Sequence, residues 1–224
     1  MNGFLDSFQM VVFILYVSLF AGRILYLRWH NRVRAIVVTI DSNKVRGVLT
    51  VCLITAITTW FVVMVTGIVN PEAQFLPPTL TFRLIDSVQT RLIGMILVSL
   101  GFIVFTAAWV TLGNSWRVGN LEENDSELIT QGIYAISRNP IYLFFILYLT
   151  GIFLINGALI FLIFAVLVTL NLHYLTLKEE TFLSRVHGLS FREYCAVTNR
   201  YITWPRRWPM SRLRSTVRYP AHSK

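Results

Sequence analysis

The sequence predicts an all-α integral membrane protein with about five transmembrane helices, the last two forming a tight helical hairpin that a cytoplasmic helical tail follows. Of the 224 residues, 55% are hydrophobic and only 14% are charged, whereas soluble domains have roughly 45–50% apolar and about 25% charged residues. Long stretches without charge also recur along the chain. The apolar content excludes a disordered chain, and a soluble domain of this size could not hide so much apolar surface in one core.

Four apolar stretches supply the predicted spans, because a helix needs about 20 mainly apolar residues to cross a hydrocarbon core of roughly 30 Å. Three of them are single spans: Phe8–Leu27, Gly47–Val69 and Leu92–Leu112. The fourth, Ile141–Leu177, has 37 residues without a charge and is too long for one span. Because Asn156-Gly157 near its middle is a turn signal, we expect a helical hairpin. Its first arm, Ile141–Ile155, rises only about 22 Å.

The basic residues predict the orientation, since Lys and Arg collect on the cytoplasmic side of a membrane. Seventeen of the 20 Lys and Arg residues lie in the alternate segments 28–46, 113–140 and 178–224. The opposite side has only Arg83 and Arg91. We therefore expect a multi-pass protein with its N-terminus outside and its C-terminus cytoplasmic. The net charge of +9 then suits anionic lipid rather than nucleic acid.

The chain divides into three predicted regions: an N-terminal three-helix membrane region at 1–111, a region at 112–204 that contains the hairpin, and a basic tail at 205–224. Asp6 is the only charge near the N-terminus, so a cleaved signal peptide is not expected. Cys52 and Cys195 are interpreted as ordinary residues, and no Cys/His spacing predicts a metal site.

The polar segment before the hairpin contains the first candidate site. Pro140 suits the first turn of a helix, where unpaired N–H groups and the positive end of the helix dipole can receive a carboxylate. Arg138 can add a bidentate contact, while Tyr134 and Tyr142 offer rings for stacking. These features suit a nucleotide-like ligand, and the alternative is a solvated loop followed by a helix start.

A second candidate follows the last span, where Glu179 and Glu180 are adjacent. Neighbours on a helix point about 100° apart, so each carboxylate can have its own partner, such as an ammonium group or Arg138. Charges at the mouth of a helix bundle suggest a function when such a partner is near; the alternative is an acidic cap beside a solvated tail. His173, inside the fifth span, is expected to be a hydrogen-bonded structural histidine rather than a catalytic base.

These segments together resemble the isoprenylcysteine carboxyl methyltransferase family, which belongs with the membrane phospholipid methyltransferases. The matching elements are, in chain order, Leu112-Gly113-Asn114-Ser115-Trp116, Leu128-Ile129-Thr130-Gln131-Gly132-Ile133-Tyr134, Arg138-Asn139-Pro140-Ile141-Tyr142, Glu179-Glu180 and His187-Gly188-Leu189-Ser190-Phe191. Each element alone is weak, but their order and spacing are specific. The resemblance therefore identifies region 112–204 as methyltransferase-like and cofactor-binding.

The resemblance implies S-adenosylmethionine as methyl donor, bound near the cytoplasmic face between the last spans and the tail. The implied cofactor-binding residues are Leu128, Ile129, Tyr134, Asn139, Pro140, Ile141, Tyr142 and Glu179. Arg138 and Glu180 are predicted to be catalytic. Because the sulfonium makes the methyl group electrophilic, transfer requires alignment and shelter from water, but neither a metal nor a covalent intermediate.

The expected acceptor is a lipophilic or lipid-linked small molecule that enters from the surrounding membrane lipids; neither nucleic acid nor an obligatory protein partner is expected. Asn139 stands where the family usually has histidine. Leu175 stands where the family often has an arginine thought to hold an acceptor carboxylate, which predicts that a farnesylcysteine analogue is a poor substrate. Two other functions remain open: a non-catalytic membrane binding or assembly protein with a decayed site, and a membrane reductase that uses a nicotinamide cofactor.

Overall fold

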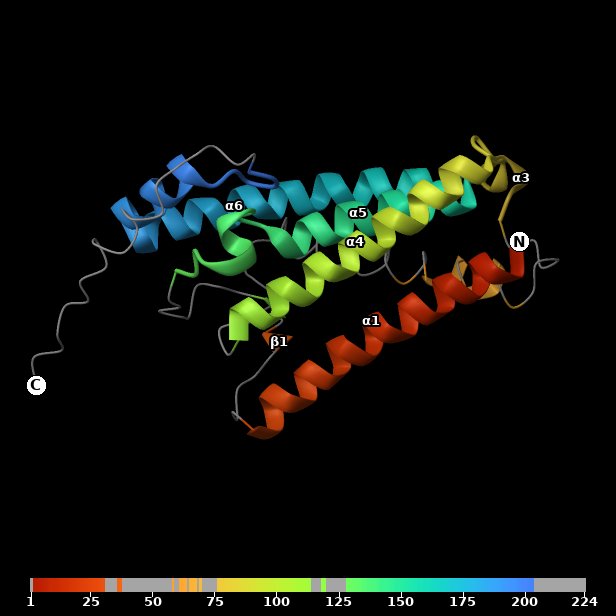
Figure 1. Cartoon of the computed structure of the whole chain (residues 1–224). Coiled ribbons are helices and arrows are strands. Elements are labelled where there is room, and N and C mark those ends of the chain that lie inside the picture. The colour runs from red at the N-terminus through yellow and green to blue at the C-terminus, as the bar shows by residue number, and fades with distance from the viewer. Residues whose placement is uncertain are drawn as a thin grey trace, which may run out of the picture.

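A computed structural model of the chain describes residues 2–30, 36–37, 58, 61–63, 65–67, 69, 76–113, 118–119 and 128–203. Most of the predicted span Gly47–Val69 lies outside these residues, as do Asn114–Arg117 and the predicted tail 205–224. The elements in chain order are α1 (Asn2–His30), β1 (Ile36–Val37), α3 (Pro78–Thr81), α4 (Val88–Leu112), β2 (Val118–Gly119), the 3₁₀ helix η2 (Gly132–Ala135), α5 (Pro140–Asn156) and α6 (Leu159–Val197) (Figure 1).

Two helices of the described chain, α4 and α6, are long and apolar enough to cross a membrane. The third predicted span is confirmed as a helix that begins four residues earlier, at Val88. Its N-cap is Ser87, whose Oγ accepts the N–H of Thr90 at 3.1 Å, which satisfies one of the free donors at the helix start. The apolar helices Gly3–Leu19, within α1, and α5 are shorter. With 17 residues, α5 rises about 25 Å.

The predicted hairpin is confirmed at Asn156 and Gly157. α5 ends at Asn156, Gly157 adopts a left-handed conformation with φ 70°, and α6 begins two residues later. Glycine reaches positive φ without the steric cost that a Cβ would add. The segment before α4 closes the turn, because Leu84 N–H donates to the carbonyl of Gly157 at 2.8 Å.

The core lies where α4, α5 and α6 meet, and side chains of α1 pack against it. α4 and α5 approach closely at Gly94 and Gly151, where a Cβ on Gly94 would lie 2.6 Å from the carbonyl oxygen of Gly151. The ring centroid of Tyr16 in α1 lies 5.4 Å from those of Phe105 and Phe144, which lie 4.9 Å from each other. Large apolar side chains also remain exposed on the outer faces, among them Leu92, Ile96, Ile103, Val110, Val166 and Leu170. Such exposed apolar faces are typical of helices that contact lipid.

The predicted helical tail begins as a direct continuation of the last span, since α6 runs without interruption to a kink at Gly188 and ends at Val197. Gly188 has φ 52° and ψ −115°, a conformation that glycine adopts more readily than other residues. After α6 the chain folds back as residues 198–203, which we name the return segment. The second half of α6, η2 and the start of α5 lie at the end of the bundle away from the hairpin turn (Figure 1).

The described residues confirm the all-α prediction apart from one short strand pair. β1 and β2 form a two-residue parallel pair, in which Ile36 lies opposite Val118 and Val37 lies opposite Gly119. The pair joins the segment after α1 to the segment after α4. Both segments were predicted to be loops, because a strand of two residues is too short to produce a recognisable sequence pattern.

Candidate functional site

The turn that precedes α5 is buried and internally hydrogen-bonded. Ser137 is fully buried, and its Oγ accepts the N–H of Asn139 at 3.1 Å. Pro140 follows as the first helical residue, where a missing N–H costs no helical hydrogen bond. The N–H groups of Ile141 and Tyr142 have no acceptor within the helix, and the side chain of Asn139 does not cap them. The start of α5 therefore presents free donors and a positive helix end.

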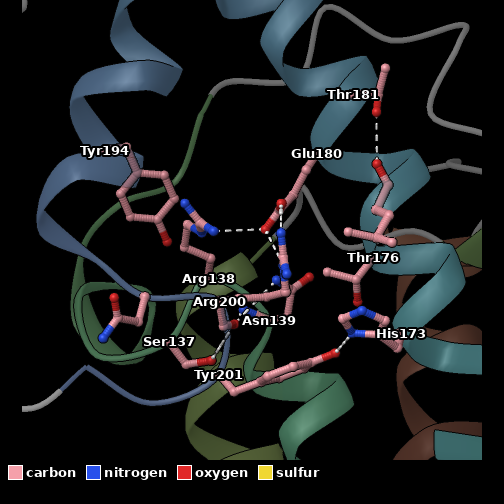
Figure 2. A network of polar contacts seen from close by, with 12 residues as sticks. Ser137, Arg138, Asn139, His173, Thr176, Glu180, Thr181, Tyr194, Arg200 and Tyr201 are labelled. Carbon is pink, nitrogen blue, oxygen red and sulfur yellow. Dashed lines mark hydrogen bonds and ion pairs between the residues drawn. The ribbon is translucent and has the colours of Figure 1, made fainter. Parts of the chain in front are cut away.

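Glu180 lies between two guanidinium groups (Figure 2). Arg138 Nη2 donates to Oε1 at 2.9 Å. Arg200 donates to both oxygens, from Nε to Oε1 at 3.0 Å and from Nη2 to Oε2 at 2.7 Å. This bidentate contact fixes direction as well as distance. The side chains of Arg138 and Glu180 are only 11% and 16% exposed, so the network is largely sheltered from water.

Glu179 faces a different partner. Its Oε2 accepts the hydroxyl of Tyr142 at 3.2 Å. It follows the apolar stretch that ends at Leu177 and lies outside the predicted span. Burial raises the pKa of Glu179, the hydrogen bond from Tyr142 lowers it in part, and the negative charge of Glu180 raises it further. The adjacent carboxylates thus have separate partners, as their angular separation on a helix predicts.

The return segment crosses the turn before α5 and binds its backbone. Arg138 N–H donates to the carbonyl of Asn199 at 3.1 Å, and Thr203 N–H donates to the carbonyl of Ile136 at 2.8 Å. These two bonds join residues 61 and 67 positions apart in the chain. They place the return segment directly beside Arg138.

Side chains strengthen the same junction. The carbonyl of Arg200 accepts Asn139 Nδ2 at 3.2 Å and Ser137 Oγ at 3.4 Å. Near the end of α6, the hydroxyl of Tyr194 donates to the carbonyl of Tyr134 in η2 at 2.6 Å. The amide of Asn139, predicted to contact the cofactor, is therefore directed at the return segment.

His173 is hydrogen-bonded, as expected from its place in an apolar helix. Its Nδ1 lies 2.9 Å from the hydroxyl of Tyr201 in the return segment (Figure 2). The contact joins α6 to the return segment and satisfies a polar group that would otherwise be costly to bury.

Burial raises the pKa of two other groups at the site. The pKa of Tyr134 is raised well above its ordinary value by burial and, to a smaller degree, by the charges of Glu179 and Tyr194. Burial also raises the pKa of the Cys195 thiol, although the positive charge of Arg138 opposes this. A protonated thiol is a poor nucleophile, which agrees with the interpretation of Cys195 as an ordinary residue.

The structure brings together most, but not all, of the predicted site residues through polar contacts. Those joined at the start of α5 and on α6 are Tyr134, Arg138, Asn139, Tyr142, Glu179 and Glu180. Pro140 begins α5 between Asn139 and Tyr142. Leu128 and Ile129 lie half-buried before η2, and Ile141 is half-buried in the first turn of α5. Their apolar side chains have no polar contacts that would test a cofactor role.

Arg200 was not among the predicted site residues and was counted only among the basic residues of the tail. Tyr194 and Tyr201 were also missed as parts of the site. A signal was present, because two adjacent carboxylates near a bundle need more positive charge than Arg138 alone supplies. The sequence does not show which of the ten basic residues of the tail pairs with Glu180, because the pairing depends on how the chain folds back after the kink at Gly188.

The donors at this site match a zwitterionic ligand. Arg138 Nε is buried and has no hydrogen-bond partner among the described residues. Its guanidinium belongs to the turn that leads into α5, and Glu179 contributes a carboxylate that contacts Tyr142 in the first turn of the same helix. The arrangement can hold a carboxylate on one side and an ammonium group on the other.

The comparison with protein families identifies this part of the chain. Residues 90–190 match the family described as phospholipid methyltransferase. The matched range includes most of α4, the turn before α5, the hairpin and both adjacent glutamates. A search of curated proteins finds no match. The family match confirms the resemblance seen in the sequence and indicates a membrane methyltransferase.

Proposed function

From the match of residues 90–190 to the phospholipid methyltransferase family, we propose that the protein is a membrane-embedded, S-adenosylmethionine-dependent methyltransferase. One observation carries the proposal. Tyr142 contacts Glu179 and Arg138 contacts Glu180, across 37 and 42 residues of chain. The two segments to which the resemblance assigns the donor therefore meet at one end of the bundle.

The residues at this end fit the methyl donor. When bound, S-adenosylmethionine would supply an electrophilic methyl group on its sulfonium. The carboxylate of Glu179 suits the ammonium group of the donor, and Arg138 Nε with the free N–H groups of α5 suits its carboxylate. The rings of Tyr134 and Tyr142 suit stacking with its base. Further cofactor contacts are proposed for Leu128, Ile129, Asn139, Pro140 and Ile141.

Arg138 and Glu180 have different tasks in this proposal. Arg138 touches the donor and fixes its orientation, which is the main requirement for an in-line transfer. Glu180 holds the guanidinium of Arg138 and prevents two like charges from facing each other uncompensated. A carboxylate or thiol acceptor can lose its proton before it binds, so no general base is required for these classes.

The membrane divides the two reactants. The polar donor arrives from the cytoplasm, and a lipophilic or lipid-linked acceptor enters between helices from the bilayer. This arrangement uses five membrane spans, with the N-terminus outside and the C-terminus and site cytoplasmic. The exposed apolar faces of α4 and α6 support the lateral route, since each reactant then approaches through the phase that dissolves it.

Ligand titration tests the proposal against its rivals. Purified protein in detergent is titrated separately with S-adenosylhomocysteine and with NADPH. We expect saturable binding of S-adenosylhomocysteine only. Binding of NADPH alone favours the membrane reductase, and binding of neither favours a protein with a decayed site.

The acceptor is then sought directly. Native membranes are incubated with the protein and methyl-labelled donor, and the labelled product is identified. A farnesylcysteine analogue is included because Leu175, which packs against the apolar core, occupies the position where a cation would hold an acceptor carboxylate. We expect slow methylation of this analogue, and efficient methylation would contradict the importance given to Leu175.

A further inference from the structure

Arg200 donates hydrogen bonds to both carboxylate oxygens of Glu180, whereas Arg138 donates to only one of them. We infer that Arg200 is a positioning residue that fixes Glu180 from the return segment and thereby orients Arg138 beside the start of α5. The inference rests on the proposed methyl-donor site. It goes beyond that proposal by assigning part of the site to a residue outside the range 90–190 matched by the family.

The hydrogen bonds support this order of dependence. Glu180 Oε2 is held by Arg200 at 2.7 Å, and Oε1 accepts both Arg200 at 3.0 Å and Arg138 at 2.9 Å. Without Arg200, only the single contact to Arg138 would remain among these three. A carboxylate held at one oxygen can rotate, so it would no longer fix the position of the Arg138 guanidinium.

Arg200 is itself held by the turn that carries Arg138. Its carbonyl accepts the side chains of Asn139 and Ser137, and the preceding residue, Asn199, accepts Arg138 N–H. The contacts therefore form a closed ring through α6, the return segment and the start of α5 (Figure 2). A ring of this kind transmits a shift at any one member to the others.

We expect the charge of Arg200 to act on Glu179 through Glu180, which Arg200 contacts at both oxygens. The ionisable groups that act on Glu179 are Tyr142 from α5, Tyr134 from η2 and Glu180 on the same helix. Glu180 supplies the negative charge in this set, and Arg200 offsets that charge at close range. Removal of Arg200 should therefore make Glu179 harder to ionise, and an uncharged Glu179 cannot pair with an ammonium group.

The test compares Arg200→Gln and Arg200→Lys with the control Arg192→Gln, which removes an exposed charge from the last part of α6, before the return segment. Affinity for S-adenosylhomocysteine is measured as a function of pH. We expect Arg200→Gln to weaken binding about three- to tenfold near neutral pH, and to move the pH dependence upward by roughly half a unit to one unit. Arg200→Lys should retain the pH dependence but recover only part of the affinity, because lysine lacks the bidentate fork. Arg192→Gln should match the unaltered protein.

A double variant separates positioning from general damage. Adding Glu180→Gln to Arg200→Gln removes the uncompensated negative charge, so the pH dependence should return toward that of the unaltered protein. Misfolding would not be reversed by this second change. If Arg200→Gln does not fold, Arg200→Lys decides the question, and unaltered affinity and turnover in that variant would overturn the inference.

A measurement without ligand keeps this inference separate from the proposed function. The infrared band of the protonated Glu179 carboxyl, assigned by its loss in Glu179→Gln, is titrated in the ligand-free protein. The band should persist to higher pH in Arg200→Gln. If S-adenosylhomocysteine binds but Arg200→Gln changes neither affinity nor titration, the inference is wrong and the proposed function stands. If S-adenosylhomocysteine does not bind, the proposed function fails, and an unshifted band would then overturn the coupling to Glu179 as well.

Discussion

The two ends of the helical bundle each contain one carboxylate between two arginines, but in opposite environments. Near the hairpin turn, Asp86 pairs with Arg83 at 3.3 Å and with Arg91. The side chains of Asp86 and Arg83 are 53% and 55% exposed, and only Arg91, at 14%, is sheltered. At the other end, Glu180 pairs with Arg138 and Arg200 in a network that is largely buried.

The difference teaches that composition alone does not determine what an ion pair contributes. Desolvation acts to raise the pKa of Asp86, but the positive charges of Arg91 and Arg83 outweigh it and lower the pKa. Water and salt screen such an exposed pair, and its contribution to stability is small. Around Glu180, loss of one partner leaves a charge sheltered from water without compensation. Only the second network therefore constrains the structure around it.

The largest expected difference between the two ends is in stability. Glu180→Ala leaves Arg138 and Arg200 without their carboxylate and should lower the free energy of unfolding by about 2–3 kcal/mol, less than for a fully buried pair because Arg200 is partly exposed. Asp86→Ala should change the unfolding curve little. Chemical unfolding in detergent measures both variants, and equal losses would contradict the contrast.

A second comparison concerns ligand affinity. Glu179→Gln removes the proposed partner of the donor's ammonium group and should weaken S-adenosylhomocysteine binding at least tenfold, about 1.4 kcal/mol. The overall fold should persist, because glutamine can still accept the hydroxyl of Tyr142. Asp86→Asn is the control and should bind normally. Unchanged affinity in Glu179→Gln would remove Glu179 from the donor site.

The raised pKa of Glu179 makes donor binding dependent on pH. Binding should weaken as the pH falls through this raised pKa, because the protonated carboxyl cannot pair with a cation. Within the same range, ligand binding should release protons, since the arriving positive charge lowers the pKa. Calorimetry in two buffers with different ionisation enthalpies measures the release, and Asp86→Asn should not alter it.

The same group has the opposite effect on folding. A carboxyl group whose pKa is higher in the folded than in the unfolded state favours folding when it is protonated. The contribution of Glu179 to the stability of the ligand-free protein should therefore decline as the pH rises through its raised pKa. Glu179→Gln cannot titrate at this position. Relative to this variant, the unaltered protein should therefore lose stability as the pH rises, and unfolding curves of both proteins over this range measure the difference.

The smallest expected effect on catalysis is at His173. His173→Gln keeps a polar group near Tyr201, so we expect turnover within about threefold of the unaltered protein and a stability loss of about 1 kcal/mol or less. A catalytic base typically contributes 10²–10⁴-fold. A loss of that size, with normal S-adenosylhomocysteine affinity, would show that His173 takes part in proton transfer.

Local sequence patterns predicted the features that depend on neighbouring residues. The apolar run before Gly113 predicted α4, and Asn156-Gly157 predicted the hairpin because glycine ends a helix at positive φ. The divergence of Glu179 and Glu180 followed from helical geometry alone. The strand pair β1–β2 was not predictable, because two-residue strands have no pattern of their own.

The sequence by itself determined an apolar helical protein with a hairpin and a family motif, since each of these rests on composition, periodicity or spacing within a short segment. Only the tertiary structure decided that Arg200 is a partner of Glu180 and that the amide of Asn139 serves the return segment. Both contacts require the chain to change direction at Gly188 and again after Val197. These contacts depend on which polar groups, far apart in the chain, can form hydrogen bonds with one another when they are buried together. No local sequence pattern contains that information.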